Sequence, residues 1–428
     1  MNQVVLAETA RRDLVTRQTE ALSKGEAIGE DVGVNPIKEA LSDAAINDKY
    51  ERGEIRIVTE QGRYPLASIS KMLEGQNYKL DPEYQRRHRW TLAQKSRLIE
   101  SFIMNVPVPP IFLYEWDFNE YEVMDGLQRM TAVREFYENV FPLSSLEYWQ
   151  ELEGKYYKDL PLKVKAGVDR RYISSMILLK ETSHGEEDPE LLKRFVFGRI
   201  NTGGVQLTPQ ELRNALYDGP INRLCKELSS NQLLRKMWGI PSNVEELVGR
   251  HEAPGETEID MLDMDAVATG SDPDVPEAYR KMIDVELVLR FFANRQRMIH
   301  YRNNLRDYLD DYLKRANGFD EATVAALRDL YVSTLTLAWD IFGVFAFRRK
   351  RGDNWGNVPS VSIYDALTNV LSRLIPEGPV LVAQKVLIAE GLDGFFATNS
   401  DKFNLRGQNR FDLMDREILL EAYLRSFL

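Results

Sequence analysis

Four residues in the first third of the chain have the types and the spacing of a phosphate site. They are Asp125, Gly126, Gln128 and Arg129, within the stretch YEVMDGLQRMTA. The first turn of a helix presents N–H groups without helical partners and a partial positive charge, which together suit an anion. An arginine there adds a planar fork that can hold phosphate at two points. Asp125 would then hold a metal ion or orient a water molecule.

The elements that must position these residues can be predicted from the pattern around them. Apolar and aromatic residues at 111–116 and 121–124 predict two short strands, and turn-forming residues at 117–120 join them. After Gly126 the spacing becomes helical, with Leu127, Met130 and Val133 on one face. A strand that ends in glycine before a helix is also an ordinary connection, so this junction alone leaves both interpretations open.

Two further blocks flank the junction, DPEYQRRHRW at 81–90 and RINTGGVQLTPQEL at 199–212. In this order and spacing, the three blocks resemble the N-terminal domain family of the GmrSD restriction systems, over roughly residues 60 to 220. That family has a ParB-like, sulfiredoxin-like fold, and no HNH nuclease half is recognised in this chain. The family usually carries DGQQR where this chain has DGLQR, with Leu127 as the departure.

The resemblance implies roles for individual residues. It implies that the domain binds a nucleoside triphosphate with Mg²⁺ and hydrolyses it. The implied catalytic residues are Asp125, Gln128 and Arg129; the implied nucleotide-binding residues are Tyr84, Gln85, Arg86, Gly126, Arg129, Thr202 and Gly203; the implied metal ligands are Asp125 and Asn201.

A more distant similarity to ParB adds a second element and a departure. Gly126, Arg129 and Ala132 match one ParB element, and Asn201, Leu207, Pro209 and Glu211 match the other, which helps to hold Mg²⁺ and a triphosphate in ParB. Ile200 and Gly204 replace a glutamate and an arginine of that second element. These replacements favour a subunit that does not catalyse.

Composition limits the class of protein. The 428 residues are ample for two hydrophobic cores, and the single cysteine, Cys225, excludes a disulfide framework. No signal peptide or comfortable membrane span is found, so we expect a cytoplasmic protein. The net charge of −11 argues against nucleic-acid binding over the whole surface. The stretch 290–306, rich in arginine and aromatic residues, is the expected docking or DNA-tracking helix.

We expect an α+β protein in which a ParB-like domain, with a small sheet and surrounding helices, precedes an all-α domain. The expected segments are a helical leader at 1–50, the ParB-like domain at 51–250, an acidic linker at 251–276 and a helical domain at 277–428. The linker is expected because eight acids and no lysine or arginine lie between Glu252 and Asp274.

The hypothesis for function is a prokaryotic antiviral defence component of the restriction type, in which nucleotide turnover controls DNA cleavage by a partner nuclease. Two alternatives are a ParB-like nuclease that acts on DNA directly and a non-catalytic subunit for DNA binding or assembly. Direct DNA binding and oligomer formation are left open by the sequence, and no membrane partner is expected.

Limited proteolysis tests the expected boundary. A protease should cut first between Glu252 and Pro276, because an acidic segment with several Pro and Gly residues cannot bury enough apolar surface to fold. Mass spectrometry of the early fragments would locate the cut. Early cleavage inside Tyr84 to Tyr217 with the acidic segment intact would contradict the expected boundary.

Overall fold

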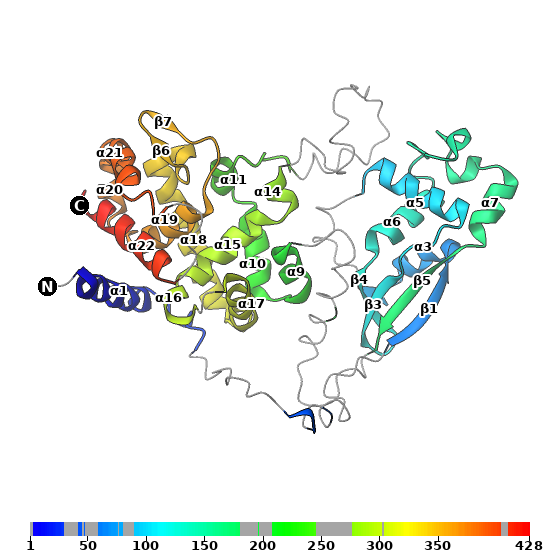
Figure 1. Cartoon of the computed structure of the whole chain (residues 1–428), viewed down its shortest axis with the longest axis horizontal. Coiled ribbons are helices and arrows are strands. Elements are labelled where there is room, and N and C mark those ends of the chain that lie inside the picture. Colours follow the sequence, from blue (N-terminus) through cyan, green and yellow to red (C-terminus); the bar gives the residue numbers. More distant parts are fainter. Residues whose placement is uncertain are drawn as a thin grey trace. The chain divides into compact units, whose positions relative to one another are not determined.

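The computed structural model describes residues 3–29, 42–44, 47, 59–75, 77–79, 90–179, 196, 208–244, 276–301, 304–403 and 410–428. Two compact units divide the chain: unit 1 is Met1–Val34, Thr208–Val244 and Pro276–Leu428, and unit 2 is Asn35–Leu207 and Glu245–Val275. Figure 1 colours the chain from blue to red. The α+β class with a helical C-terminal region is confirmed.

Unit 2 contains a mixed sheet of five strands in the order β1-β5-β3-β4-β2. The β3–β4 and β1–β5 pairs are antiparallel, whereas β3–β5 and β2–β4 are parallel. The predicted strands at 111–116 and 121–124 are thus confirmed as β3 and β4. The strands are β1 (Thr59–Pro65), β2 (Tyr78–Lys79), β3 (Ile111–Asp117), β4 (Glu120–Asp125) and β5 (Tyr172–Leu178).

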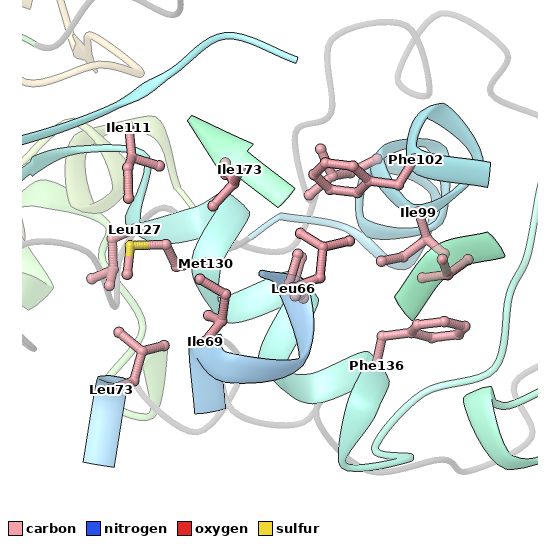
Figure 2. Packing of buried hydrophobic residues seen from close by; sticks show 14 of the residues in the cluster. Leu66, Ile69, Leu73, Ile99, Phe102, Ile111, Leu127, Met130, Phe136 and Ile173 are labelled. Carbon is pink, nitrogen blue, oxygen red and sulfur yellow. The ribbon is translucent and has the colours of Figure 1, made fainter. Parts of the chain in front are cut away.

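The helices of unit 2 pack on the apolar side of this sheet. Alternate residues of β3, among them Ile111 and Leu113, point to the core because successive strand side chains face opposite sides. Ile69, Met130 and Phe136 from two helices belong to the same buried cluster (Figure 2). The helices are α3 (Ile69–Glu74), α5 (Leu92–Met104), α6 (Leu127–Tyr137) and α7 (Leu162–Asp169), with 3₁₀ turns η1 (Leu66–Ser68), η2 (Gln150–Leu152) and η3 (Tyr157–Asp159).

Unit 1 is helical, with one hairpin of two-residue strands as the exception to the expected all-α domain. Its central helix, α15 (Ile283–Asn294), is buried along almost its whole length. The helices around it are α1 (Gln3–Glu20), α9 (Pro209–Leu216), α10 (Pro220–Ser229), α11 (Gln232–Trp238), α14 (Glu277–Arg280), α16 (Arg297–His300), α17 (Leu305–Ala316), α18 (Glu321–Phe342), α19 (Val361–Arg373), α20 (Gly378–Ala383), α21 (Lys385–Thr398) and α22 (Arg410–Arg425), with η6 (Gly343–Phe345) and the strands β6 (Lys350–Arg351) and β7 (Asn354–Trp355).

The units divide the chain differently from the expected segments. α1, expected as a separate leader, packs on α22, where Arg11 forms an ion pair with Asp415 at 2.8 Å. α10, expected in the ParB-like domain, packs on α15 and α18 through Ile221, Leu224 and the buried Cys225. The apolar faces of these helices therefore complete the helical core. The expected linker at 251–276 lies almost wholly outside the described residues.

The expected basic docking surface at 290–306 is wrong. Arg290, Arg295 and Arg297 are 8%, 3% and 2% exposed. Arg290 donates from Nε to Asp365 at 3.0 Å, and Arg295 pairs with Glu26 at 2.9 Å. Burial of a charge requires a partner of opposite sign, and both partners come from distant parts of the chain. The stretch is also divided among α15, α16 and α17, and Arg302 lies outside the described residues.

No helix in the described part of the chain has both the length and the apolar character needed to cross a bilayer. The long apolar run at 331–347 is the second half of α18 and the turn after it. Its residues Leu335 and Ala338 are fully buried. The run therefore forms part of the helical core of unit 1.

The Arg290–Asp365 pair gives a stability prediction. Asp365→Ala should destabilise unit 1 by about 3–5 kcal/mol, because it removes the two-point partner of a buried guanidinium and leaves it only the longer contact to Glu286 at 3.4 Å. Glu227→Ala is the matched control, since it breaks the exposed Arg328–Glu227 pair and should cost at most about 1 kcal/mol. Calorimetric unfolding of both variants would measure the difference. Equal, small losses would show that the buried pair does not support unit 1.

Candidate functional site

The junction between β4 and α6 depends on a glycine. Gly126 is the N-cap of α6 and has a φ of 99°, a backbone conformation that side chains with a Cβ rarely adopt. A Cβ at Gly126 would lie 2.5 Å from Ile111 Cγ2. The glycine therefore does two things: it turns the chain from strand to helix, and it lets β3 approach closely.

Arg129 in the first turn of α6 is held inside the protein. One terminal nitrogen, Nη2, donates to Asp125 Oδ2 at 2.6 Å. The other, Nη1, donates to the carbonyl oxygens of Pro109 and Pro110, the latter at 3.3 Å. Burial lowers the pKa of Arg129, and the charge of Asp125 opposes that shift. The fork that was expected to grip phosphate thus joins the start of β3 to the start of α6.

Asp125 is the exposed member of this pair. Its side chain is 52% exposed, whereas that of Arg129 is 10% exposed. One carboxylate oxygen bonds Arg129, and the open position of the group leaves room for a water molecule or a cation. Among the described residues, no group of three or more His, Cys, Asp or Glu side chains could hold a metal. A Mg²⁺ ion here would take its other ligands from water and phosphate, as this ion commonly does.

Gln128 connects the junction to the upstream block. The backbone N–H of Trp90 donates to Gln128 Oε1 at 3.4 Å. Thr91, the next residue, caps α5 through a capping box with Gln94. The end of the YQR block therefore lies at the first turn of α6. Tyr84, Gln85 and Arg86 themselves lie outside the described residues.

Only the second half of the second ParB-like element, from Thr208 onward, belongs to the described residues. Asn201, Thr202 and Gly203 lie outside the described residues, so their expected roles stay predictions. Glu211 is 1% exposed and accepts the N–H of Thr208 at 2.5 Å, while its own N–H donates to Thr208 Oγ1. These two bonds form a capping box. Glu211 thus stabilises the start of α9 in unit 1.

The sequence analysis missed the carbonyl oxygens of Pro109 and Pro110 as partners of Arg129. Both prolines lie between the end of α5 and the start of β3. One signal in the sequence could have indicated this contact. The two prolines come directly before β3, and β3 pairs with β4, the strand that leads into Gly126 and Arg129. Proline keeps its carbonyl acceptor although it lacks an N–H, so such a turn can bind a buried guanidinium.

Together, the mixed sheet, the glycine-capped α6 and the acid at the end of β4 define an α+β domain with one site at a strand–helix junction. Residues 69–217 match the family described as GmrSD restriction endonuclease, N-terminal domain. The match covers less than half of the chain, and within it the segment is similar to that N-terminal domain. No curated protein and no solved structure was found to match the chain.

The close approach at Gly126 can be separated from its backbone strain by two variants. Gly154 also has a positive φ, +75°, but nothing lies within 4 Å of its added Cβ. Gly154→Ala should therefore lower the free energy of unfolding by only about 1–2 kcal/mol, the cost of holding an alanine at a positive φ. Gly126→Ala should lower the free energy of unfolding by about 1–3 kcal/mol more than Gly154→Ala does, because the side chain of Ile111 must also move. Urea unfolding would measure both; equal losses would mean that the Ile111 contact is not limiting.

Proposed function

We propose that this protein is a restriction-type defence component whose unit 2 binds and hydrolyses a nucleoside triphosphate to control DNA cleavage by a partner nuclease. The observation that carries the proposal is the hydrogen bond from Trp90 N–H to Gln128 Oε1. It joins the end of the YQR block to the first turn of α6, which directly follows Asp125 and Gly126. Two of the three blocks behind the family resemblance therefore meet at one place.

The chemistry proposed for this place needs little beyond positioning. Phosphoryl transfer depends mainly on holding the phosphates in line and neutralising their charge. The first-turn amides of α6 would bind phosphate oxygens, and Arg86 would approach from the YQR block. Asp125 would orient the attacking water or a Mg²⁺-bound water through its exposed oxygen. The remaining proposed contacts are Tyr84, Gln85, Thr202 and Gly203 for the nucleotide and Asn201 for the metal.

The proposed phosphate contact of Arg129 requires its ion pair with Asp125 to rearrange. Both terminal nitrogens of Arg129 have protein partners, so a direct phosphate contact through them requires the ion pair to rearrange. A phosphate near α6 would compete with Asp125 for the guanidinium. Nucleotide binding would then free the carboxylate of Asp125 for water or Mg²⁺.

The same pair favours one alternative, a subunit that binds without turnover. If the Asp125–Arg129 pair persists with nucleotide bound, one carboxylate oxygen of Asp125 stays committed to Arg129 and only the other can contact water or Mg²⁺. A nuclease that cuts DNA directly is less well supported by the site. A two-metal cut of a phosphodiester needs several converging ligands, and the described residues contain no such cluster.

Phosphate release from a panel of nucleoside triphosphates with Mg²⁺ tests the proposal. Asp125→Asn keeps an oxygen for Arg129 but loses the negative charge, so turnover should fall about 100-fold or more while nucleotide binding changes little. Glu138→Gln is the control, because Glu138 lies at the other end of α6 and bonds Ser70. Turnover in Asp125→Asn equal to wild type would reject the catalytic role; binding without turnover in wild type would favour the alternative.

A further inference from the structure

A basic segment of unit 2 is set apart from the acidic chain around it. Residues 155–171 include six cationic side chains and two acidic ones, although the whole chain has a net charge of −11. The cations are Lys155, Lys158, Lys163, Lys165, Arg170 and Arg171, and the acids are Asp159 and Asp169. We refer to residues 155–171, which include η3 and α7, as the basic segment.

The cations of this segment have no acidic partner, in contrast to Lys95 and Arg129 of the same unit. Lys95 pairs with Glu135 at 2.7 Å, and Arg129 pairs with Asp125. Within the described part of the chain, no ion pair involves Lys155, Lys158, Lys163, Lys165 or Arg170. Asp169, the nearest acid in sequence to Arg170, instead accepts the hydroxyls of Tyr137 at 3.1 Å and Tyr157 at 2.7 Å.

Exposure and aromatic contacts keep these charges at the surface. Lys158, Lys163 and Arg170 are exposed. Lys165 Nζ lies 4.4 Å from the centre of the Tyr157 ring, and Lys158 Nζ lies 5.5 Å from that of Tyr156. A ring face attracts an ammonium group without neutralising it, so both lysines keep their charge for an external anion.

The start of the basic segment is fixed by an unusual loop. The loop is closed where Leu143 N–H donates to the Lys155 carbonyl at 3.0 Å and Gly154 N–H donates to the Leu143 carbonyl at 2.8 Å. Inside it, the six consecutive N–H groups of residues 144–149 all donate to side chains, those of Ser96, Glu100 and Glu153. A loop without a helix or strand ladder is thereby made rigid.

The other end of the segment is fixed as well. α7 packs beside α5 and η1, with Val168 fully buried (Figure 1). Arg171 Nε donates to the Phe102 carbonyl at 3.1 Å. The cations therefore stand on a backbone that is held in place at both ends, which lowers the entropy lost when they bind an extended partner.

We propose that the basic segment is the surface on which unit 2 docks the phosphate backbone of DNA. Phosphate contacts in protein–DNA complexes come largely from Lys and Arg side chains, and neutralised phosphates release bound cations. The centres of protein–protein interfaces are, in contrast, depleted in lysine. A lysine-rich surface segment without ion pairs thus fits DNA better than it fits a protein partner. This segment takes the place of the stretch at 290–306, in which Arg290, Arg295 and Arg297 are buried.

The inference deepens the proposed function by locating its DNA contact, and it can be tested without nucleotide. Full-length protein should bind a labelled DNA duplex in fluorescence anisotropy, with an affinity that falls steeply as salt rises. Lys158→Gln/Lys163→Gln should weaken binding about tenfold or more at low salt and reduce the slope of log K against log salt by about 2, since two phosphate contacts are lost. Phosphate release from nucleotides should not change, which separates this test from that of the site at Asp125.

Lys71→Gln/Lys385→Gln is the matched control, because it removes the same charge from two exposed lysines outside the basic segment. Its salt slope should stay close to that of wild type. Leu162→Ala is a second control: Leu162 is 86% exposed on α7 and would matter for a protein partner but not for phosphate. The proposal would be overturned if Lys158→Gln/Lys163→Gln and Lys71→Gln/Lys385→Gln gave the same slope of log K against log salt. It would also be overturned if the wild-type protein did not bind DNA.

Discussion

The buried guanidinium of Arg129 is the interaction on which the candidate site depends. Its donors meet the carbonyls of Pro109 and Pro110 on one side and Asp125 on the other, and so it connects the entry of β3 to the junction of β4 and α6. A buried charge without partners would be strongly unfavourable, so these groups must stay together. Gly126 makes the arrangement possible, because any Cβ there would contact both Ile111 and Arg129. Asp125 is held at the surface by the same interaction.

Buried arginines also organise the helical unit. Arg290 with Asp365, Arg295 with Glu26, and Arg373 with Glu417 and Glu421 connect α15, α19 and α22 to the segment after α1. Burial raises the pKa of Glu417, and Arg373 acts against that shift. Such pairs add little net stability compared with apolar packing, but removing one partner is costly. They therefore restrict which helices can pack together more than they increase the stability of unit 1.

The distribution of ion pairs changes how the charge of this protein is understood. Arginines that look like a binding helix in the sequence are neutralised inside unit 1, while the lysines of residues 155–171 stay unpaired at the surface of unit 2. The net charge of the chain predicts neither the burial of these arginines nor the exposure of these lysines. Binding of an external anion depends on which cations have no partner within the protein. Lysine also suits the exposed segment, since its ammonium is strongly hydrated, whereas arginine tolerates burial better.

The sequence by itself determined the local elements around the site. Strand alternation gave β3 and β4, the helical spacing after Gly126 gave α6, and the capping residues Thr91 and Thr208 marked the starts of α5 and α9. These features depend on neighbours within a few residues, so they can be recognised without the fold. Only the tertiary structure decided the partners of Arg129, the burial of Arg290 and Arg295, and the assignment of α1 and α10 to unit 1. Each of these depends on groups far away in the chain, and whether a charged side chain faces water or an opposite charge is set by packing that no local pattern records.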